Sequence, residues 1–507
     1  MARAFSRSVI LSLVSGRIAL ATGLFWGLLV GCGGGRSLPA DGGGGQGGNA
    51  LDQQLIADVD VLFVIKDSRE ATVVQQNLVA NFPAFVAGLR SSDNGLPNLH
   101  VGVTTTSMGA GAFTATVPTC QTPDLGNLVH DVRAATDPVC TSARIRAGDH
   151  FIVALANESQ TNYSGNLSDV FRCIAQVGSS ACIFEQPLAA ARAALGDPTM
   201  GLQAPAGNQG FLRDAALLAV ILVDDEDDCS VPPDSMLFDP SQTMLSDPLG
   251  PLASFRCTEF GITCDGLTAN NGRIPRTAGG PYTGCRSNDA LAQIDRLHAL
   301  TPLQFFVDYF QRVKVLPGHL VMAALAAQPE PFVVGVEPMT QFPGLVASCA
   351  ASNGMLGFPG VRLRQLVDAF GPVGSIRPVC QNSYQDAMVA FAQLVGSPLR
   401  TCLQAVPADV ANPGQPVPRP GLDGAVDPNR VSCTAADDAG AIAPCNPAGQ
   451  PAGTCWALLS APDCATGIRA AVCRNGFAAI SSGQPCPPGP NSTPDGDHVI
   501  LHCTTPP

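Results

Sequence analysis

Six apolar runs recur along the chain, and most are separated by segments with helical spacing. Apolar side chains at helical spacing mark residues 74–89, 188–195, 303–313 and 384–395. This alternation predicts βαβ units, and therefore a doubly wound α/β domain with a mostly parallel sheet. The run at residues 217–223 is the most apolar and is expected to be central. The six predicted strands are residues 59–65, 99–104, 150–155, 217–223, 320–325 and 375–379.

This α/β domain is expected to cover residues 55–403. Two segments rich in turn residues and cysteine, at 107–148 and 229–300, are predicted to be insertions in it. Residues 404–430 are rich in Pro, Gly and Asp, which indicates a linker or an ordered, extended crossing. Residues 431–507 contain seven cysteines and short apolar runs, and are predicted to form a small β module stapled by disulfides. Seven is an odd number, and Cys402 is the nearest outside partner.

The N-terminus carries basic residues, then an apolar run at residues 18–30, then Gly31 and Cys32. This pattern resembles the export signal of bacterial lipoproteins, which implies a signal peptide at 1–31 and a lipidated Cys32. The alternative is a short membrane helix with a chance cysteine. Residues 33–48 are mostly glycine, and residues 32–54 are expected to be a flexible tether. By resemblance to known sorting rules, Gly33 implies attachment to the outer membrane, facing the periplasm or the cell surface.

The cysteine count supports the same compartment. Of 19 cysteines, Cys32 is reserved for lipid, which leaves an even number. The chain has no Cys-x-x-Cys motif, so disulfides in an oxidising compartment are favoured over metal clusters. Short separations favour local pairs, and the candidates are Cys120 with Cys140, Cys173 with Cys182, and Cys257 with Cys264.

Charge excludes some partners. The formal net charge is −13 and only 14% of residues are charged. Nucleic-acid phosphates need clustered Lys and Arg, so nucleic acid is not expected as a partner. Electrostatic docking on anionic lipid is disfavoured for the same reason, and membrane attachment is expected through the N-terminal lipid alone.

Two predicted strands end in polar loops. The first runs into Lys66, Asp67, Ser68, Arg69 and Glu70, and the fourth runs into residues 224–228, five consecutive carboxylates. Ligands of open α/β sheets bind beyond the carboxyl ends of the strands. These two loops are therefore the candidate site.

In this order of elements the chain resembles the von Willebrand factor A family. The resemblance implies a metal-ion-dependent adhesion site made of an Asp-x-Ser-x-Ser loop, a threonine loop and a late aspartate. Lys66 stands where the first aspartate is expected, Ser68 matches the first serine, and Glu70 replaces the second. Asp225 matches the late aspartate, whereas the threonine loop would fall near residues 182–185 and has no clear threonine.

Lys66 changes the chemistry expected at this site. An ammonium cannot ligate a divalent cation, which needs oxygen ligands in a negative cage. Lys66 within about 4 Å of Asp225 would gain Coulomb attraction on the order of 4 kcal/mol, before desolvation, at an effective dielectric of 20. We therefore expect a degenerate adhesion site, with Lys66, Asp67, Ser68, Glu70 and Asp225, that holds no magnesium. The alternative is that Lys66 simply reaches water.

The acidic run either is solvated or holds a cation. Calcium suits several carboxylate oxygens in flexible geometry, and the candidate ligands are Asp224, Asp225, Asp227 and Asp228. The run lacks the alternate spacing and turn glycine of an EF-hand loop, so a solvated loop without any cofactor is the other interpretation.

Catalytic motifs are scarce. There is no Gly-x-Ser-x-Gly, no His-Glu-x-x-His and no phosphate loop. The resemblance to the von Willebrand factor A family implies instead a lipid-anchored binding or adhesion module of the cell envelope, with an envelope protein or a glycan as partner. A structural envelope lipoprotein without a ligand and a secreted hydrolase are the alternatives.

Overall fold

The computed structural model describes most of the chain after residue 49. The described residues are 50–55, 58–69, 71–90, 96–133, 137–214, 216–314, 319–399, 403, 405–412, 414–418, 426–437, 440–445, 455–460, 466–473 and 499–506. The predicted signal peptide, the lipidated Cys32 and Glu70 lie outside these residues.

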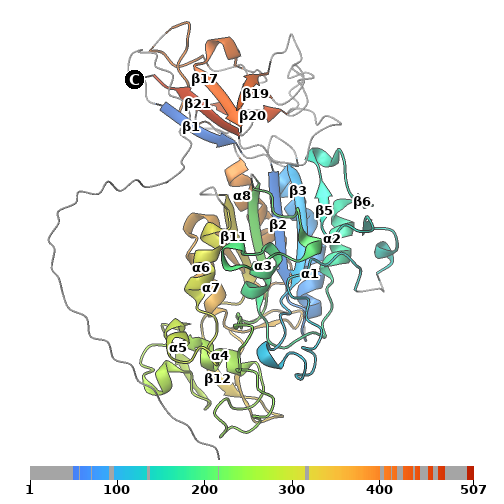
Figure 1. Ribbon diagram of the computed structural model, residues 1–507, viewed down its shortest axis with the longest axis vertical. Helices are drawn as coiled ribbons and strands as arrows, with labels where there is room; N and C mark the ends of the chain where they lie inside the picture. Colours follow the sequence, from blue (N-terminus) through green and yellow to red (C-terminus); the bar gives the residue numbers. More distant parts are fainter. Residues whose placement is uncertain are drawn as a thin grey trace, which may run out of the picture. The chain divides into compact units, whose positions relative to one another are not determined.

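All six predicted strands form one sheet (Figure 1). Its order is β16-β11-β7-β2-β3-β5, and every neighbouring pair is parallel except β3 with β5. The prediction of an α/β domain with a mostly parallel sheet is therefore confirmed. The strands are β2 (Asp58–Ile65), β3 (Asn98–Thr105), β5 (Ile152–Ala154), β7 (Leu217–Val223), β11 (Leu320–Ala326) and β16 (Gly374–Pro378).

Helices cover both faces of this sheet, and this explains why β2, β3, β7 and β11 are buried along their whole length. Alternate residues of β2 point to opposite sides, so Phe63 lies in one core and Leu62 in the other. The Phe63 side is covered by α1 (Ala71–Arg90), α2 (Leu167–Ala175) and α8 (Gln385–Leu399). The Leu62 side is covered by α3 (Pro187–Leu195), α6 (Leu303–Arg312) and α7 (Val361–Asp368).

The insertion at 229–300 is not independent of the later chain. It contains α4 (Phe255–Gly261), α5 (Asp289–Ile294), β8 (Ile262–Thr263), β9 (Gly279–Tyr282) and β10 (Arg286–Ser287). β9 pairs with β12 (Phe332–Val336), which also pairs with β13 (Pro343–Leu345). A hairpin that follows β11 therefore completes the insertion. The remaining short strands pair as β4 (Arg144–Ile145) with β6 (Tyr163–Ser164) and β14 (Cys349–Ala350) with β15 (Leu356–Gly357).

The C-terminal module is a second six-stranded sheet, and one of its strands comes from the N-terminal side. β1 (Ala50–Leu55) pairs antiparallel with β21 (Val499–Thr504). The prediction that residues 32–54 form a flexible tether is thus wrong for its last residues. The sequence of β1 has little apolar signal, and this strand is ordered because it pairs with a strand near the other end of the chain. The sheet order is β1-β21-β17-β18-β19-β20. The other strands are β17 (Cys433–Asp437), β18 (Gly440–Pro444), β19 (Cys455–Ser460) and β20 (Ile468–Cys473).

The segment predicted as a Pro-rich linker belongs partly to this module. Val417 and Val426 are buried in the same core as Trp456 and Leu501. Their burial favours the ordered crossing over a free linker, since apolar side chains fix the segment against the sheet.

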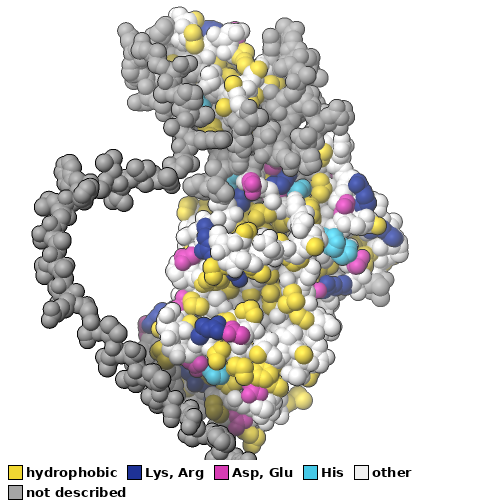
Figure 2. All heavy atoms as spheres, in the orientation of Figure 1, with side chains coloured by type: hydrophobic (Ala, Val, Ile, Leu, Met, Phe, Trp, Pro, Cys, Tyr) yellow, Lys and Arg dark blue, Asp and Glu magenta, His cyan; other side chains and the backbone are white. Residues whose placement is uncertain are grey.

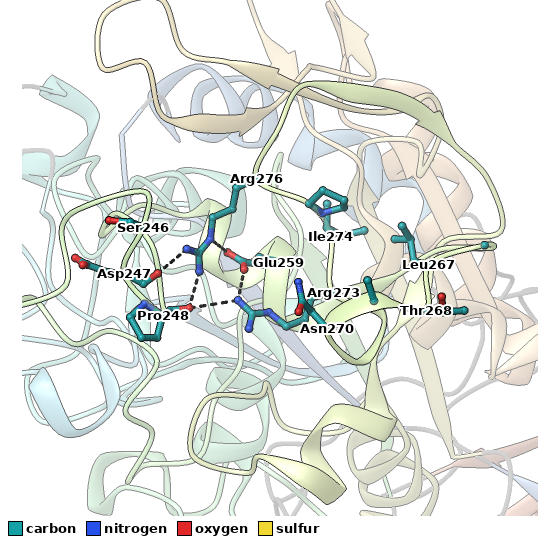
Figure 3. Close-up of a pocket in the computed structure, with 13 residues that line it drawn as sticks. Ser246, Asp247, Pro248, Glu259, Leu267, Thr268, Asn270, Arg273, Ile274 and Arg276 are labelled. Atoms are coloured by element: carbon teal, nitrogen blue, oxygen red, sulfur yellow. Dashed lines mark hydrogen bonds and ion pairs between the residues drawn. The ribbon is translucent and has the colours of Figure 1, made fainter.

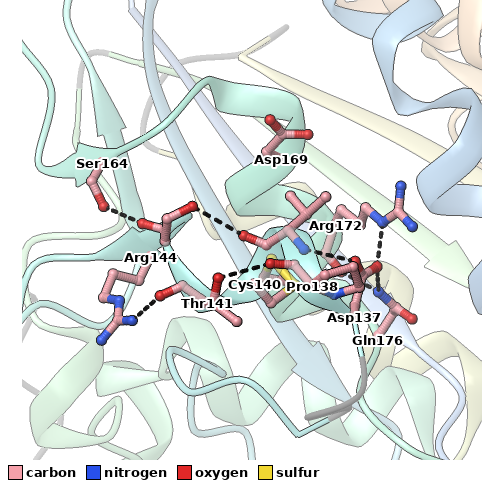
Figure 4. The surroundings of a disulfide bond; sticks show 12 residues. Asp137, Pro138, Cys140, Thr141, Arg144, Ser164, Asp169, Arg172 and Gln176 are labelled. Atoms are coloured by element: carbon pink, nitrogen blue, oxygen red, sulfur yellow. Dashed lines mark hydrogen bonds and ion pairs between the residues drawn. A yellow bond between two sulfur atoms is a disulfide. The ribbon is translucent and has the colours of Figure 1, made fainter.

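Disulfides are present as predicted, but the predicted partners are wrong. All six candidate cysteines are bonded, and none to its expected neighbour. Cys140 pairs with Cys173, because α2 packs Cys173 against the short helix at 138–141 (Figure 4). Loop closure becomes costlier only slowly with length, so short separation is a poor guide to pairing. The described bonds are Cys120–Cys182, Cys140–Cys173, Cys229–Cys257, Cys264–Cys285, Cys349–Cys380, Cys433–Cys503 and Cys445–Cys455.

This many disulfides are typical of a protein outside the reducing cytoplasm. Over the described ranges, none of the helices combines the length and the apolar character that crossing a bilayer requires.

Candidate functional site

The register of the central strands brings three loops to one edge of the sheet. Ile65 lies beside Val223 in β7 and beside Thr105 in β3, so all three strands end at the same level. Backbone bonds continue past these ends: Lys66 donates its N–H to Val223, and Thr106 donates to Ile65. The residues that follow the strands therefore meet, as expected for parallel strands.

Lys66 lies at the centre of this edge and is 1% exposed. Its ammonium donates hydrogen bonds to Asp225 and, at 3.0 Å, to Oε1 of Glu226. Burial alone would lower the pKa of Lys66, but the carboxylates of Glu226, Asp225, Glu185 and Asp224 hold it well above the usual value. The alternative that Lys66 reaches water is wrong, since the side chain stays buried and charged. We call Lys66 with these four carboxylates the Lys66 cluster.

Glu185, like Glu226, is a member of the cluster that sequence reasoning did not assign to the site. It is 2% exposed and accepts a hydrogen bond from the hydroxyl of Thr106. Burial raises the pKa of Glu185 to about 8, although Lys66 opposes the shift. Glu185 lies in residues 182–185, where the family pattern expects a threonine, so that pattern gave no reason to name a carboxylate there.

Asp67 and Ser68 are also buried at this edge. Thr106 Oγ1 lies 3.4 Å from Oδ1 of Asp67. Burial, and then repulsion by Asp124, raise the pKa of Asp67 to about 7. Ser68 is 3% exposed, and its side chain opposes the upward shift in the pKa of Glu185. The described residues of the predicted site, Lys66, Asp67, Ser68 and Asp225, are thus brought together.

These shifts make stability depend on pH. Between its unfolded pKa of 4.5 and its folded pKa of about 8, Glu185 binds more proton in the folded state than in the unfolded state. The free energy of unfolding therefore falls as pH rises across that window. His100, whose pKa burial lowers from 6.5 to about 4, acts in the opposite direction at lower pH.

We expect the melting temperature to fall as the pH rises from 6.5 to about 8, where Glu185 and Asp67 titrate and His100 is already neutral. Glu185→Gln should flatten this slope, and Glu330→Gln at an exposed position should leave it unchanged. Thermal unfolding at a series of pH values measures the slope. A wild-type melting temperature that is flat or rises over this range would contradict the assignment.

The carboxylates of the acidic run, residues 224–228, make different contacts. Asp224 accepts the N–H of Glu226 at 2.9 Å. Asp227 accepts the first N–H groups of α7, from Val361, Arg362 and Leu363, and so caps that helix.

Asp228 forms a buried ion pair with Arg362 at 3.0 Å and accepts the hydroxyl hydrogen bond of Ser230. The run is therefore not a solvated loop. In the part of the chain that the structure describes, no three His, Cys, Asp or Glu side chains are grouped to hold a metal. Calcium at Asp224, Asp225, Asp227 and Asp228 stays an untested prediction, with two of its four ligands engaged at α7.

A pocket of about 550 Å³ opens beside the Lys66 cluster, and we call it the strand-end pocket. One wall is the polar loop end, with Ser68, Arg69 and Glu226. The insertion and its hairpin supply apolar walls, including Leu252 and Phe342. The wall residue Phe358 donates its N–H to the carbonyl of Asp225, which ties this wall to the strand ends.

Another pocket, of about 530 Å³, lies within the insertion (Figure 3). There Arg273 and Arg276 both donate to Glu259, and Arg276 also donates to the backbone carbonyls of residues 245, 247 and 248. These arginines stabilise the loop at residues 245–248. This pocket contains no part of the predicted site.

No protein-family model matches this chain, and no curated protein matches it. Among solved structures, the pilus adhesin (RrgA) from Streptococcus pneumoniae is similar with a TM-score of 0.27 and 10% sequence identity, over 89% of this chain and 57% of that chain. The chain thus spans a little over half the length of that protein. A likeness this weak supports no statement about function.

Proposed function

We propose that this protein is a lipid-anchored binding module of the bacterial cell envelope, which acts through the strand-end face of its α/β domain without bound magnesium and without catalysis. The observation that carries the proposal is the Lys66 cluster beside the strand-end pocket. A buried ammonium held by Asp225 and Glu226 lies where ligands of this fold class bind, next to an open pocket with both polar and apolar walls.

The resemblance to the von Willebrand factor A family implies a role for the Lys66 cluster. In that family the first loop and the late aspartate hold a metal ion. Here Lys66 stands at the first acidic position and contacts Asp225, the counterpart of the late aspartate. Glu185 comes from the loop that would supply the threonine. One fixed positive charge among carboxylates can therefore replace the ion electrostatically, and ligand binding would need no metal.

The test is sedimentation of the detergent-solubilised full chain with envelopes isolated from the producing bacterium, with and without EDTA. We expect saturable binding that EDTA leaves unchanged and that Ile183→Lys, a substitution at a partly exposed apolar residue of the pocket wall, weakens. Binding abolished by EDTA would contradict the metal-free site. No saturable binding would favour a structural role, and turnover in a hydrolase substrate panel would favour an enzyme.

Membrane attachment is proposed to depend on Cys32. Cys32→Ser should release the protein from the outer-membrane fraction or leave it uncleaved, because the thiol is the site of lipid addition. Cell fractionation and the mass of the N-terminal peptide measure this. Cys140→Ser, at a cysteine within the α/β domain, is the control and should leave fractionation unchanged. Unchanged fractionation and peptide mass in Cys32→Ser would reject the lipid anchor.

A further inference from the structure

The strand-end pocket carries surplus negative charge. Lys66 pairs with two carboxylates, and the side chain of Asp225 is 4% exposed whereas that of Glu226 is 29% exposed. Only Glu226 of this pair lines the pocket. One ammonium is thus shared by two carboxylates, and the surplus charge faces the pocket.

The other charged groups of the pocket wall do not reverse this sign. Asp227 and Asp228 also line it, but α7 and Arg362 occupy their oxygens. Glu337 is exposed on the hairpin wall and adds negative charge, and Arg69 is the exposed cation that opposes it.

Apolar surface surrounds this charge. Ile183 lines the pocket and is 38% exposed, and Phe342, Pro343 and Leu345 line its hairpin wall. Met339, between two pocket residues of the same hairpin, is 96% exposed. Figure 2 shows apolar side chains gathered over the part of the molecule where α4, α5 and β12 lie. Exposed apolar groups around a charged pocket are typical of a surface that a partner covers.

We propose that the strand-end pocket binds a lysine or arginine side chain carried on an apolar segment of a partner polypeptide. This inference rests on the proposed function, because it names the chemistry that the strand-end face would recognise. The partner's cation pairs with the surplus carboxylate of Glu226, and its apolar neighbours cover Ile183 and the hairpin. In a site that holds a metal ion, an acidic ligand would complete the coordination of that ion. In the strand-end pocket, an acidic ligand would instead be repelled by the carboxylate of Glu226.

Phenethylamine and hydrocinnamate test this charge preference, since both join a phenyl ring to a charged group through two methylenes. In ligand-observed NMR titrations of the full chain at low salt, we expect the amine to bind more tightly than the acid by tenfold or more. Glu226→Gln should weaken the amine about fivefold, since it removes one partly screened charge. Asp308→Asn, at an exposed position of α6 outside the pocket, should change nothing.

Three results would overturn the inference: equal or tighter binding of the acid, no binding of either probe, or amine binding that Glu226→Gln leaves unchanged. Each of these is distinguishable from failure of the proposed function. Saturable binding to envelopes with no preference for the amine would reject the cationic partner alone. Amine binding in the pocket without binding to envelopes would reject the envelope role alone.

Discussion

Replacing Lys66 with methionine is expected to lower the free energy of unfolding by about 3 to 5 kcal/mol, because it leaves buried carboxylates without their cation. The ammonium of Lys66 is 1% exposed and contacts Asp225 and Glu226. Methionine fills similar volume but supplies no charge. The loss should shrink at low pH, where the carboxylates accept protons instead. Chemical denaturation followed by circular dichroism measures the change.

Arg69→Met is the matched control for this substitution. Arg69 lies three residues further along the same loop and is exposed, so its replacement should change stability by no more than about 0.5 kcal/mol. Lys66→Met with wild-type stability at neutral pH would show that the ammonium does not neutralise the cluster.

Removing the disulfide between Cys433 and Cys503 is expected to have the second large effect. The bond joins β17 to β21 across a separation of 70 residues. In the chain-entropy account, a loop of this length stabilises the fold by about 4 kcal/mol, against about 3 kcal/mol for the shorter loop of Cys445 and Cys455. Replacing both cysteines of the longer loop with alanine should therefore destabilise the C-terminal module more.

Trp456 reports this module, since it is buried in its core and the only other tryptophan, Trp26, lies in the predicted signal peptide. Denaturation followed by tryptophan fluorescence should shift to lower denaturant concentration in the double variant. The matching double variant of Cys140 and Cys173, in the α/β domain, should leave the Trp456 transition in place. An unchanged transition after loss of Cys433 and Cys503 would contradict the expected role of the bond.

The central sheet was predictable because most of its strands, β7 and β11 above all, are apolar in their own sequence. Residues 217–223 are buried throughout β7, between helices on both faces. β1, β9 and β12 were not predicted, since they pair with segments that lie far away in the sequence. The disulfide partners were missed for a related reason: the packing of α2 decides them, and the separation along the chain does not.

The candidate site was predictable in part. Strand order placed Lys66, Ser68 and Asp225 at one edge, and the expected contact of Lys66 with Asp225 is confirmed. The second carboxylate partner, Glu226, was outside the family pattern and so was not named. The roles of Asp227 and Asp228 depend on α7, whose N-terminus and Arg362 no local pattern indicated.

The most direct test of the proposed metal-free site is calorimetric titration of the full chain with magnesium, for the wild type, Lys66→Asp and Asp225→Ala. The account predicts no magnesium binding by the wild type. It predicts binding by Lys66→Asp, because a carboxylate opposite Asp225 replaces the ammonium. A parallel calcium titration tests the acidic run. Micromolar magnesium binding by the wild type that Asp225→Ala abolishes would show an intact metal site and contradict the account.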